Sequence, residues 1–554
     1  MAIGTLGIAL TGLAAAQAGI RTTEHNISNI NTAGFRRQEV AYAALNPGFS
    51  GTYYGSGVGV STVRNLYSQF QDSQVLLDQA QLSRNEAYAT LASQVDAQVG
   101  DANSGMTSAI DAFFSATQTV ATDPTSNAAR QVMLSSGRNL AARFNTLSTA
   151  FTDANDDINR EIAATVIRVN SYTSQISTLS TNIARLEGGT GQPANDLRDQ
   201  RDQLVSELNK LINVTPVQQT DGAFNLYVGS GQPLVVGNSV TTMTSVSDST
   251  TPEFDVPALN MAGGVTQSLD ASMISGGKLG GLMAVRDDIL HPAMQDLDRL
   301  AMVFADQFNT QHTLAGAAFD KFGVQGVNFF TSSSLLFQQP AALPTNAPGS
   351  PAITATLSNS SQLVASDYEL SFDGATYTLT RLSDGASSPA AAVATINGVQ
   401  QGFTLAVGAG VAVAGDRWLI RPSHGAAGTL ASLISDPNLI AASSTSAGSP
   451  GNNVRALALA DLQTDPTING QDTFSSAYAQ LVSRTATLAS EADINVAAYE
   501  TLASQSKAAQ QAISGVNLDE EAANLIRFQQ AYQASAKAMQ VASSLFDELI
   551  GILR

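Results

Sequence analysis

The sequence predicts a mainly α-helical protein with β insertions, and three patterns support this prediction. Both ends of the chain carry apolar residues at the spacing of an amphipathic helix. A longer stripe of the same kind, from Leu140 to Leu186, predicts one very long helix in the interior. Segments near 214–275 and within 341–425 show the alternation and turn residues of strands instead. We therefore expect a long coiled-coil-like helical bundle built from both chain ends, a smaller β insertion and a projecting all-β domain.

The two ends supply the candidate assembly interface. The apolar face near the N-terminus runs until Asn31, Thr32 and Gly34, which are residues that end helices. That face comprises Ile3, Leu6, Leu10, Leu13, Ile20, Ile27 and Ile30. The heptad stripe near the C-terminus, with its intervening positions, comprises Leu518, Leu525, Phe528, Tyr532, Met539, Ala542, Phe546, Leu549 and Leu553.

Isolated amphipathic helices are marginally stable in water, so we expect these two faces to pack on each other and on neighbouring copies of the chain. On this interpretation the terminal helices are largely unfolded in the monomer and fold on assembly. The alternative is that both helices only complete the core of one monomer.

Helical periodicity fills most of the region between the ends. One helix is expected over 65–99, and another is expected to end near Asp123 because a proline follows. The long interior helix is expected to end at Gly188–Gly189, and Asn195 is expected to open an antiparallel return helix. A tight turn at 276–281 should open a further helix.

The predicted β segments depend on shorter patterns. Residues 224–228 alternate between apolar and polar, and two glycines then turn the chain into a partner strand. Beyond a linker over 331–351, alternation on both sides of Asp373–Gly374 predicts a two-residue hairpin. Residues 46–59 cluster glycine, serine and tyrosine around a proline, and are expected to be a loop or a short extended segment.

These patterns divide the chain into three nested parts. Residues 1–64 with 505–554 are expected to form a terminal assembly domain. Residues 65–340 with 426–504 are expected to form a helical rod domain, which contains the β insertion near 214–275. Residues 341–425 are expected to form the outer β domain. The β parts are thus insertions into a helical rod whose two chain ends lie together.

Composition argues against several classes of function. The formal net charge of −19 argues against nucleic acid as a partner, because phosphate binding needs clustered cations. The absence of cysteine excludes disulfides, thiolate metal sites and cysteine nucleophiles. No uninterrupted apolar run has the length of a membrane span. The run from Leu6 to Ala18 resembles a signal peptide incompletely, because no lysine or arginine precedes Arg21.

No catalytic, cofactor-binding or metal-binding residues are predicted. The four histidines lack the spacing of a two-histidine metal face. His312, near Asp320, comes closest to a site, but a histidine in a last helical turn more often interacts with the helix dipole and caps carbonyls. The acids at 519–521 fit the first turn of a helix, and 276–281 lacks the spacing of a phosphate-binding loop.

Motifs at both ends resemble those of one group of proteins. Residues 514–525 and 529–537 resemble the C-terminal signature of bacterial flagellar rod, hook and hook-associated proteins. Residues 26–35 resemble the N-terminal signature of the same group through Asn26, Asn29, Asn31, Thr32, Gly34 and Phe35.

Interior motifs point to one family within this group. Residues 197–204 and 276–282, together with Arg286–Asp287, Asn309 and His312, resemble the hook-associated protein 1 family of hook–filament junction proteins. The chain departs from that family's common pattern at Ala33 and at Phe35–Arg36. The second departure leans toward hook or rod proteins, so hook protein or another flagellar axial protein is the alternative.

The resemblance implies a structural, non-enzymatic component of the extracellular bacterial flagellum. It implies that the chain leaves the cytoplasm uncleaved through the flagellar type III export apparatus and self-assembles as a ring between hook and filament. The implied partners are further copies of the chain, hook protein, a second hook-associated junction protein and a helical export chaperone that binds the C-terminal region. A secreted oligomeric enzyme or adhesin is the alternative from another class, and it requires a concave polar site with perturbed titratable groups.

Overall fold

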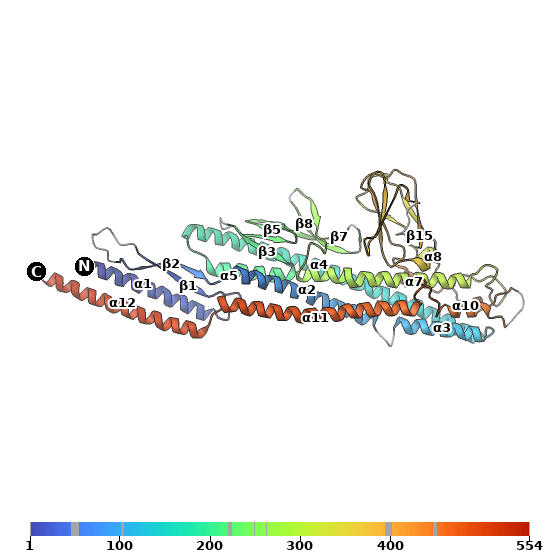
Figure 1. Ribbon diagram of the computed structural model, residues 1–554, viewed down its shortest axis with the longest axis horizontal. Coiled ribbons are helices and arrows are strands. Elements are labelled where there is room, and N and C mark those ends of the chain that lie inside the picture. Colours follow the sequence, from blue (N-terminus) through green and yellow to red (C-terminus); the bar gives the residue numbers. More distant parts are fainter. Residues whose placement is uncertain are drawn as a thin grey trace.

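The computed structural model describes residues 2–45, 55–100, 105–219, 224–248, 250–261, 263–393, 402–446 and 451–552. The molecule is elongated, with long helices along one axis and the β parts on one side (Figure 1). Both chain ends lie at the same end of the molecule. The predicted fold class, mainly α with β insertions, is confirmed.

The helices account for the length of the molecule. The α-helices are α1 (Ala2–Ser28), α2 (Gln69–Val99), α3 (Met106–Thr122), α4 (Asn127–Thr190), α5 (Asn195–Leu211), α6 (Gly277–Val285), α7 (His291–His312), α8 (Ser333–Leu336), α9 (Ala426–Thr429), α10 (Val454–Asp461), α11 (Phe474–Ser514) and α12 (Leu518–Ile552). A π-helical turn over Arg286–Leu290 joins α6 to α7, and 3₁₀ turns lie at Ser360–Gln362 and Pro437–Leu439.

The strands form small antiparallel sheets. They are β1 (Gln38–Ala44), β2 (Val58–Asn65), β3 (Val214–Gln218), β4 (Phe224–Val228), β5 (Gln232–Val236), β6 (Ser239–Val240), β7 (Met243–Ser247), β8 (Asp255–Asn260), β9 (Thr266–Ser268), β10 (Ala341–Ala342), β11 (Ile353–Leu357), β12 (Tyr368–Phe372), β13 (Tyr377–Arg381), β14 (Ser387–Ala390), β15 (Phe403–Val407) and β16 (Arg417–Ile420).

The helices α2 to α7, α10 and α11 form a bundle that we call the rod. Within it α2 lies along α11, and α3 and α5 lie along α4. The core of the rod is rich in phenylalanine, and the rings of Phe113 and Phe308 have their centroids 5.1 Å apart. Seven rings that are at most 1% exposed form this cluster: Phe113, Phe114, Phe304, Phe308, Phe329, Phe330 and Phe474. The rod therefore has a hydrophobic core of its own.

Helix α4 is the long interior helix that the sequence predicts. The Ser126 side chain caps its N-terminus by accepting a hydrogen bond from the Ala129 amide. The predicted end at Gly188–Gly189 is wrong, because the helix continues through both glycines to Thr190. It ends at Gly191, whose φ of 66° lies in the left-handed region that terminates helices. The return helix α5 does begin at Asn195.

Close backbone packing explains the glycine-rich turn at 276–281. Gly277 has a φ of +73°, and a Cβ placed there would lie 2.7 Å from the Ile212 backbone nitrogen. A Cβ at Gly281 would lie 2.2 Å from the Arg84 carbonyl oxygen of α2. Only glycine permits the backbone to come this close at both positions, so these residues allow α6 to pack against α2 and the end of α5.

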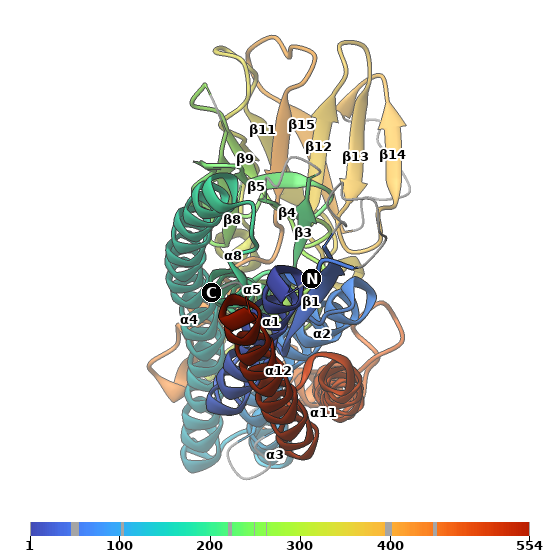
Figure 2. The same cartoon turned by 90° about the vertical axis from the view of Figure 1, so that its left-hand side faces the viewer.

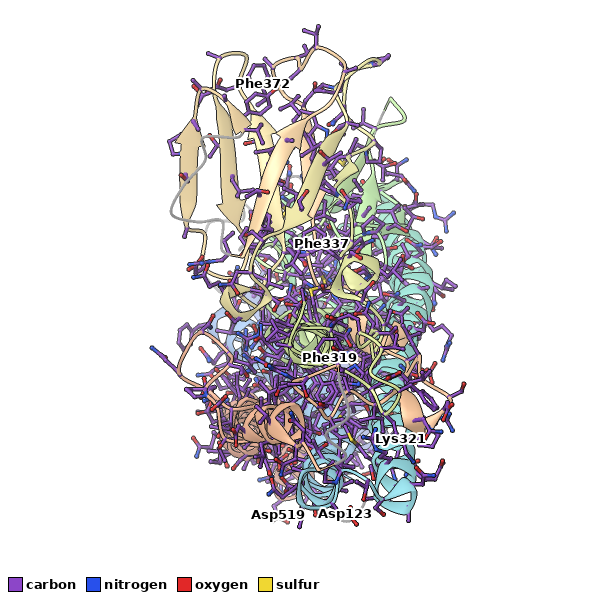
Figure 3. All side chains as sticks on the ribbon, turned by 90° about the vertical axis from the view of Figure 1, so that its right-hand side faces the viewer. Asp123, Phe319, Lys321, Phe337, Phe372 and Asp519 are labelled. Carbon is purple, nitrogen blue, oxygen red and sulfur yellow. The ribbon has the colours of Figure 1, made fainter. Side chains whose placement is uncertain are left out.

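Strands β3 to β9 form the inner insertion, with sheet orders β3-β4-β5-β6 and β7-β8-β9. Strands β10 to β16 form the outer domain, with orders β10-β16-β12-β13-β14 and β11-β15. The predicted hairpin exists, but Phe372 pairs with Tyr377, so its loop has four residues, 373–376, and the prediction of two was wrong. Figure 3 shows Phe337 between the outer domain and the helices, and its ring lies 6.3 Å from that of Phe403.

A hairpin of β1 and β2 follows α1 and packs on it. The sequence predicts a loop or a short extended segment over 46–59, and Val58 and Gly59 at the end of this range belong to β2. Residues 46–54 lie outside the described residues. The helix expected over 65–99 begins only at Gln69, because Asn65 ends the strand.

Candidate assembly interface

Helices α1 and α12 lie side by side beyond one end of the rod, and we call them the terminal pair. Figures 1 and 2 show the two helices against each other, with the hairpin beside α1. The pair joins the two predicted stripes in one structural unit. Helix α1 ends at Ser28, so Ile30 lies in the turn that follows it, not on the helix as expected.

The face of α1 that meets α12 consists of small residues. A Cβ placed at Gly19 would lie 2.6 Å from the Phe528 ring, and one at Gly12 would lie 3.0 Å from the Ser535 hydroxyl. The residues of this face recur at alternating spacings of three and four, as a coiled-coil seam does. They are Ala9, Gly12, Ala16, Gly19, Thr23 and Asn26.

The large residues of the predicted N-terminal stripe do not form this seam. Leu6 is 41% exposed and Leu10 is 58% exposed, as is Ile8 at 41%, which the prediction did not include. Leu13 lies with Met539 in a shallow groove of about 450 Å³ beside the pair. Ile20 and Ile27 are half-buried. The expectation that the whole stripe meets α12 is therefore wrong for Leu6 and Leu10.

The predicted C-terminal stripe faces α1 in part. Leu525, Phe528 and Met539 are half-buried. Among the side chains of α12 that the structure describes, Ala542 is the buried apolar one, at 4% exposed. Large side chains of the same stripe stay exposed, namely Leu518 at 52%, Phe546 at 41% and Tyr532 at 36%. Three predicted positions, Ile3, Leu549 and Leu553, have side chains outside the described part of the structure.

The motif after α1 forms a polar turn around Asn26. The Asn26 amide nitrogen donates to the Gln38 carbonyl oxygen at 2.9 Å and to the Glu521 carboxylate at 3.1 Å. The Gln38 backbone amide donates back to the Asn26 side-chain oxygen at 2.9 Å. Asn26 is 1% exposed, so all these bonds form away from solvent. They join α1, β1 and α12.

The remaining motif residues shape the turn itself. Asn29 donates to the His25 carbonyl oxygen at 3.0 Å, and the Thr32 hydroxyl donates to the Asn29 side chain at 3.1 Å. Gly34 has a φ of +79°, and a Cβ there would lie 2.8 Å from the Gln203 side chain of α5. Phe35 packs edge-on against the His25 ring, with centroids 5.4 Å apart. Asn31 is exposed.

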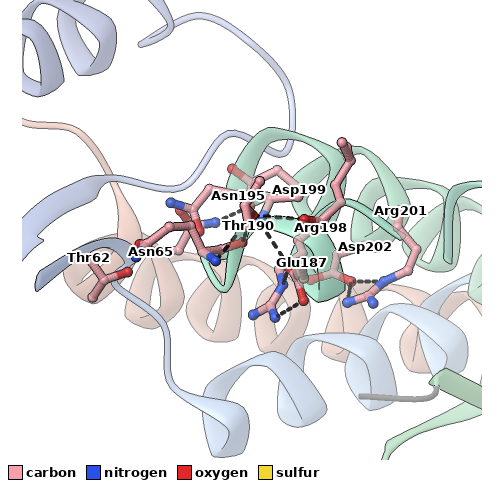
Figure 4. Close-up of polar contacts among 12 residues, drawn as sticks. Thr62, Asn65, Glu187, Thr190, Asn195, Arg198, Asp199, Arg201 and Asp202 are labelled. Atoms are coloured by element: carbon pink, nitrogen blue, oxygen red, sulfur yellow. Dashed lines mark hydrogen bonds and ion pairs between the residues drawn. The ribbon is translucent and has the colours of Figure 1, made fainter. Parts of the chain in front are cut away.

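Arg36, which follows the motif, reaches the rod. Its guanidinium pairs with Asp202, with Asp72 at 2.9 Å and with Asp199 at 3.7 Å. Its backbone amide donates to Asp199 at 3.0 Å, and Asn65 donates to the same carboxylate at 2.7 Å. Burial raises the pKa of Asp199 to about 7, although the bonds from Arg36 oppose this rise. Figure 4 shows Asn65, Asp199 and Asp202 gathered at the start of α5.

Arg37 reaches the opposite way, to the first turn of α12. Its guanidinium pairs with Glu520 and with Glu521, each at 2.7 Å. Glu521 is 2% exposed, so the sequence interpretation of 519–521 as first-turn acids missed its main contacts. The two arginines are visible in the sequence, but Glu520 lies 483 residues from Arg37 and Glu521 lies one residue further, so no local pattern connects them.

His312 is a structural histidine of the rod. The Ala441 amide donates to its Nε2 at 2.9 Å, so the proton sits on Nδ1, which donates to the Val327 carbonyl oxygen at 2.6 Å. Burial lowers its pKa to about 4, so the ring is neutral and the predicted interaction with the helix dipole is wrong. Asp320 accepts backbone amides of its own loop.

Two features are absent from the described residues. Those residues contain no cluster of three or more histidine, cysteine or acidic side chains placed to hold a metal ion. No helix among them combines the length and apolarity that a membrane crossing requires.

Comparisons with known proteins identify the family. Residues 92–330 match the flagellar hook-associated protein FlgK helical domain, residues 344–422 match the flagellar hook-associated protein 1 D2-like domain, and residues 509–552 match the C-terminal domain of flagellar basal body rod FlgEFG proteins.

Individual relatives agree with the family models. Flagellar hook-associated protein 1 of Escherichia coli is 35% identical over 98% of each chain, and that of Salmonella typhimurium is 34% identical over 98% of this chain and 99% of its own. The flagellar hook junction protein FlgK from Burkholderia pseudomallei matches with a TM-score of 0.72 and 26% identity over 80% of this chain and 100% of its own. The chain belongs to the flagellar hook-associated protein 1 family.

Proposed function

We propose that the chain is the structural protein that joins the flagellar hook to the filament. Family membership supports this proposal, as does the likeness to a solved structure described as a flagellar hook junction protein. On this proposal the chain has no enzymatic role and acts by assembling. No observation favours the alternative of a secreted oligomeric enzyme or adhesin.

One observation carries the assembly mechanism: the terminal pair uses its small residues internally and leaves several of its large apolar residues exposed. Gly12 and Gly19 accept α12, while Leu6 and Leu10 on the same helix stay exposed. Burying a leucine contributes about 1.5–3 kcal/mol, and the seam of small residues supplies little of this. The pair is therefore marginal alone and gains most of its apolar burial from neighbouring copies of the chain.

The division of the chain follows from this mechanism. The expected boundary at 505 lies within α11, which continues in the rod to Ser514. Residues 1–64 with 515–554 therefore form the assembly domain, residues 65–340 with 426–514 form the rod domain, and residues 341–425 project outward. The partners on this proposal are further copies of the chain, hook protein and a second hook-associated junction protein.

The exposed side chains also suit transport before assembly. A terminal helix without its lattice presents Leu518, Tyr532 and Phe546 at its surface. An amphipathic helix of this kind fits a groove on a helical export chaperone. We propose that such a chaperone binds the C-terminal helix in the cytoplasm, and that the chain then passes uncleaved through the flagellar type III export apparatus.

Hydrogen exchange tests the mechanism. The full-length monomer is compared with a shortened chain that lacks residues 1–35 and 515–554. The terminal helices are expected to exchange freely in the monomer, while the rod is protected equally in both chains. Terminal helices as protected as the rod in a verified monomer would show that they belong to its core, and the proposed folding on assembly would fail.

A further inference from the structure

We propose that Arg36 and Arg37 are positioning residues that fix the inclination of the terminal pair to the rod. This inference rests on the proposed junction function, because the inclination decides which neighbours the exposed leucines of α1 can reach. The two arginines are adjacent in sequence, and their side chains pair with acids on opposite sides of one joint.

The covalent connection at this joint is slight. The terminal pair and its hairpin are joined to the rod only through residues 66–68 and 515–517. The Arg37 backbone lies at both crossings, since its amide donates to the Ser514 carbonyl oxygen and its own carbonyl accepts from the Leu66 amide, each at 2.9 Å. Arg37 thereby holds the end of α11 and the segment before α2 together.

The side chains extend this link in both directions. Arg36 binds Asp72 of α2 and Asp199 and Asp202 of α5, which are all in the rod. Arg37 binds Glu520 and Glu521 of α12, which is in the terminal pair. A planar guanidinium can hold two acceptors at fixed directions, so each arginine constrains an angle as well as a distance.

The burial of these pairs separates them from ordinary surface contacts. The side chains of Arg36, Asp199 and Glu521 are 15%, 6% and 2% exposed. A further contact across the joint, between His25 Nε2 and the Asp196 carboxylate at 3.2 Å, joins side chains that are 39% and 58% exposed, and it contributes little for that reason.

Electrostatics also makes Arg36 hard to replace. It faces three carboxylates, and Arg201, a cation beside them, pairs with Asp202. Without Arg36 the three carboxylates at the start of α5 and α2 would repel one another. The turn that follows the motif would then lose its attachment to these acids on the rod surface.

The test uses the full chain in a flagellated bacterium that lacks its own hook-associated protein 1. The variants are Arg36→Gln, Arg37→Gln and Arg36→Lys. The matched control is Arg64→Gln, because Arg64 pairs with Glu39 on the exposed hairpin, where their side chains are 62% and 54% exposed. The measurements are the amount of exported chain, the thermal unfolding midpoint of the purified chain, and the fraction of hooks that carry a filament in electron micrographs.

We expect the fraction of hooks with filaments to fall at least about tenfold in both glutamine variants, because the joint opens to hydrate the acid that has lost its partner. Export and the unfolding midpoint should match the control, because neither change touches the phenylalanine core of the rod. Arg36→Lys should restore part of that fraction, because lysine keeps the charge but not the planar fork.

Two results would overturn the inference. In the first, both glutamine variants carry filaments as often as the control. In the second, filament loss accompanies a lower unfolding midpoint or poorer export, which would make the arginines part of the rod's fold alone. Failure of the wild-type chain to restore filaments would instead contradict the proposed junction function.

Discussion

The rod and the terminal pair place their large apolar residues in opposite ways. In the rod, Phe113, Phe304 and Phe330 are at most 1% exposed and their rings lie 5.1–5.7 Å apart. In the terminal pair, small residues lie inside, while Leu6 and Leu10 remain exposed. The same helical periodicity therefore serves a core within one chain in the rod and, on the proposed function, a surface for other chains in the terminal pair.

The largest difference should appear when one aromatic ring is removed from each region. Phe304→Ala should lower the free energy of unfolding of the rod by about 3–5 kcal/mol, because it leaves a cavity in the core. Phe528→Ala, in the half-buried seam of α12, should leave the unfolding of the rod unchanged. Urea unfolding of the full chain, followed by circular dichroism, measures both. Equal losses would show that the terminal pair is part of the same cooperative core.

Acidic pH should act on the rod through His312. Its pKa is lowered to about 4, whereas the unfolded chain takes up the proton near its ordinary value, about 6.5. The stability linked to this neutral ring is therefore present above pH 6.5 and is lost as pH falls toward 4. At pH 5 the loss is about 2 kcal/mol.

The comparison of wild type with His312→Gln isolates this term, because the buried Asp298, whose pKa is raised to about 7, acts in the opposite direction in both chains. The free energy of unfolding is measured at pH 7.5 and pH 5 for each chain. The wild type should lose more stability than the variant. Identical losses would show that His312 does not set the pH response.

Substitutions at two glycines of α1 should have opposite effects, because one glycine lies in the seam and the other on the exposed face. Gly7→Ala meets no atom within 4 Å and should strengthen the helix by up to about 1 kcal/mol, because alanine favours helix over glycine. Gly19→Ala places a methyl group 2.6 Å from the Phe528 ring and should cost about 1–3 kcal/mol of pairing. Filament attachment in cells is the measurement. If Gly19→Ala attaches filaments as well as Gly7→Ala, the seam is not close-packed.

The smallest effect on stability should come from the exposed leucine. Leu10→Ser should change the free energy of unfolding by no more than about 0.5 kcal/mol, because the side chain is 58% exposed. It should nevertheless reduce filament attachment strongly if neighbouring copies cover this face. Gln17→Ser, at an exposed polar position of the same helix, serves as the control. Normal attachment with Leu10→Ser would remove this face from the proposed interface.

The sequence analysis succeeded where periodicity alone determines structure. The long stripe between Leu140 and Leu186 lies in α4, and Asn195 opens α5 as predicted. The prediction failed on α1, where large apolar side chains are exposed and the buried side chains are small. The predicted apolar face of α1 consists of leucine and isoleucine residues. The helix instead meets α12 through Gly12, Gly19 and their small neighbours, which an apolar periodicity does not detect.

Local sequence patterns also could not predict contacts between residues that are distant in the chain. The bond from Asn26 to Glu521 spans 495 residues, and that from Arg36 to Asp199 spans 163. The acids at 519–521 match an ordinary first helical turn, because local sequence indicates where the helix starts but not that Arg37 pairs with Glu520 and Glu521. The hairpin of β1 and β2 was missed for a related reason, since turn residues within 46–59 outweighed the short strand beside them.

The placement of both chain ends beside each other changes the cost of bringing them together. Closing a loop between Asn26 and Glu521 in an unfolded chain carries an entropy penalty that grows with the logarithm of the 495 residues between them. Folding of the rod removes most of that penalty in advance, because it sets α2 and α11 side by side. Each terminal helix then meets its partner at a high effective concentration. The folded rod thus connects the two terminal helices in the way that a short loop connects the two helices of a hairpin.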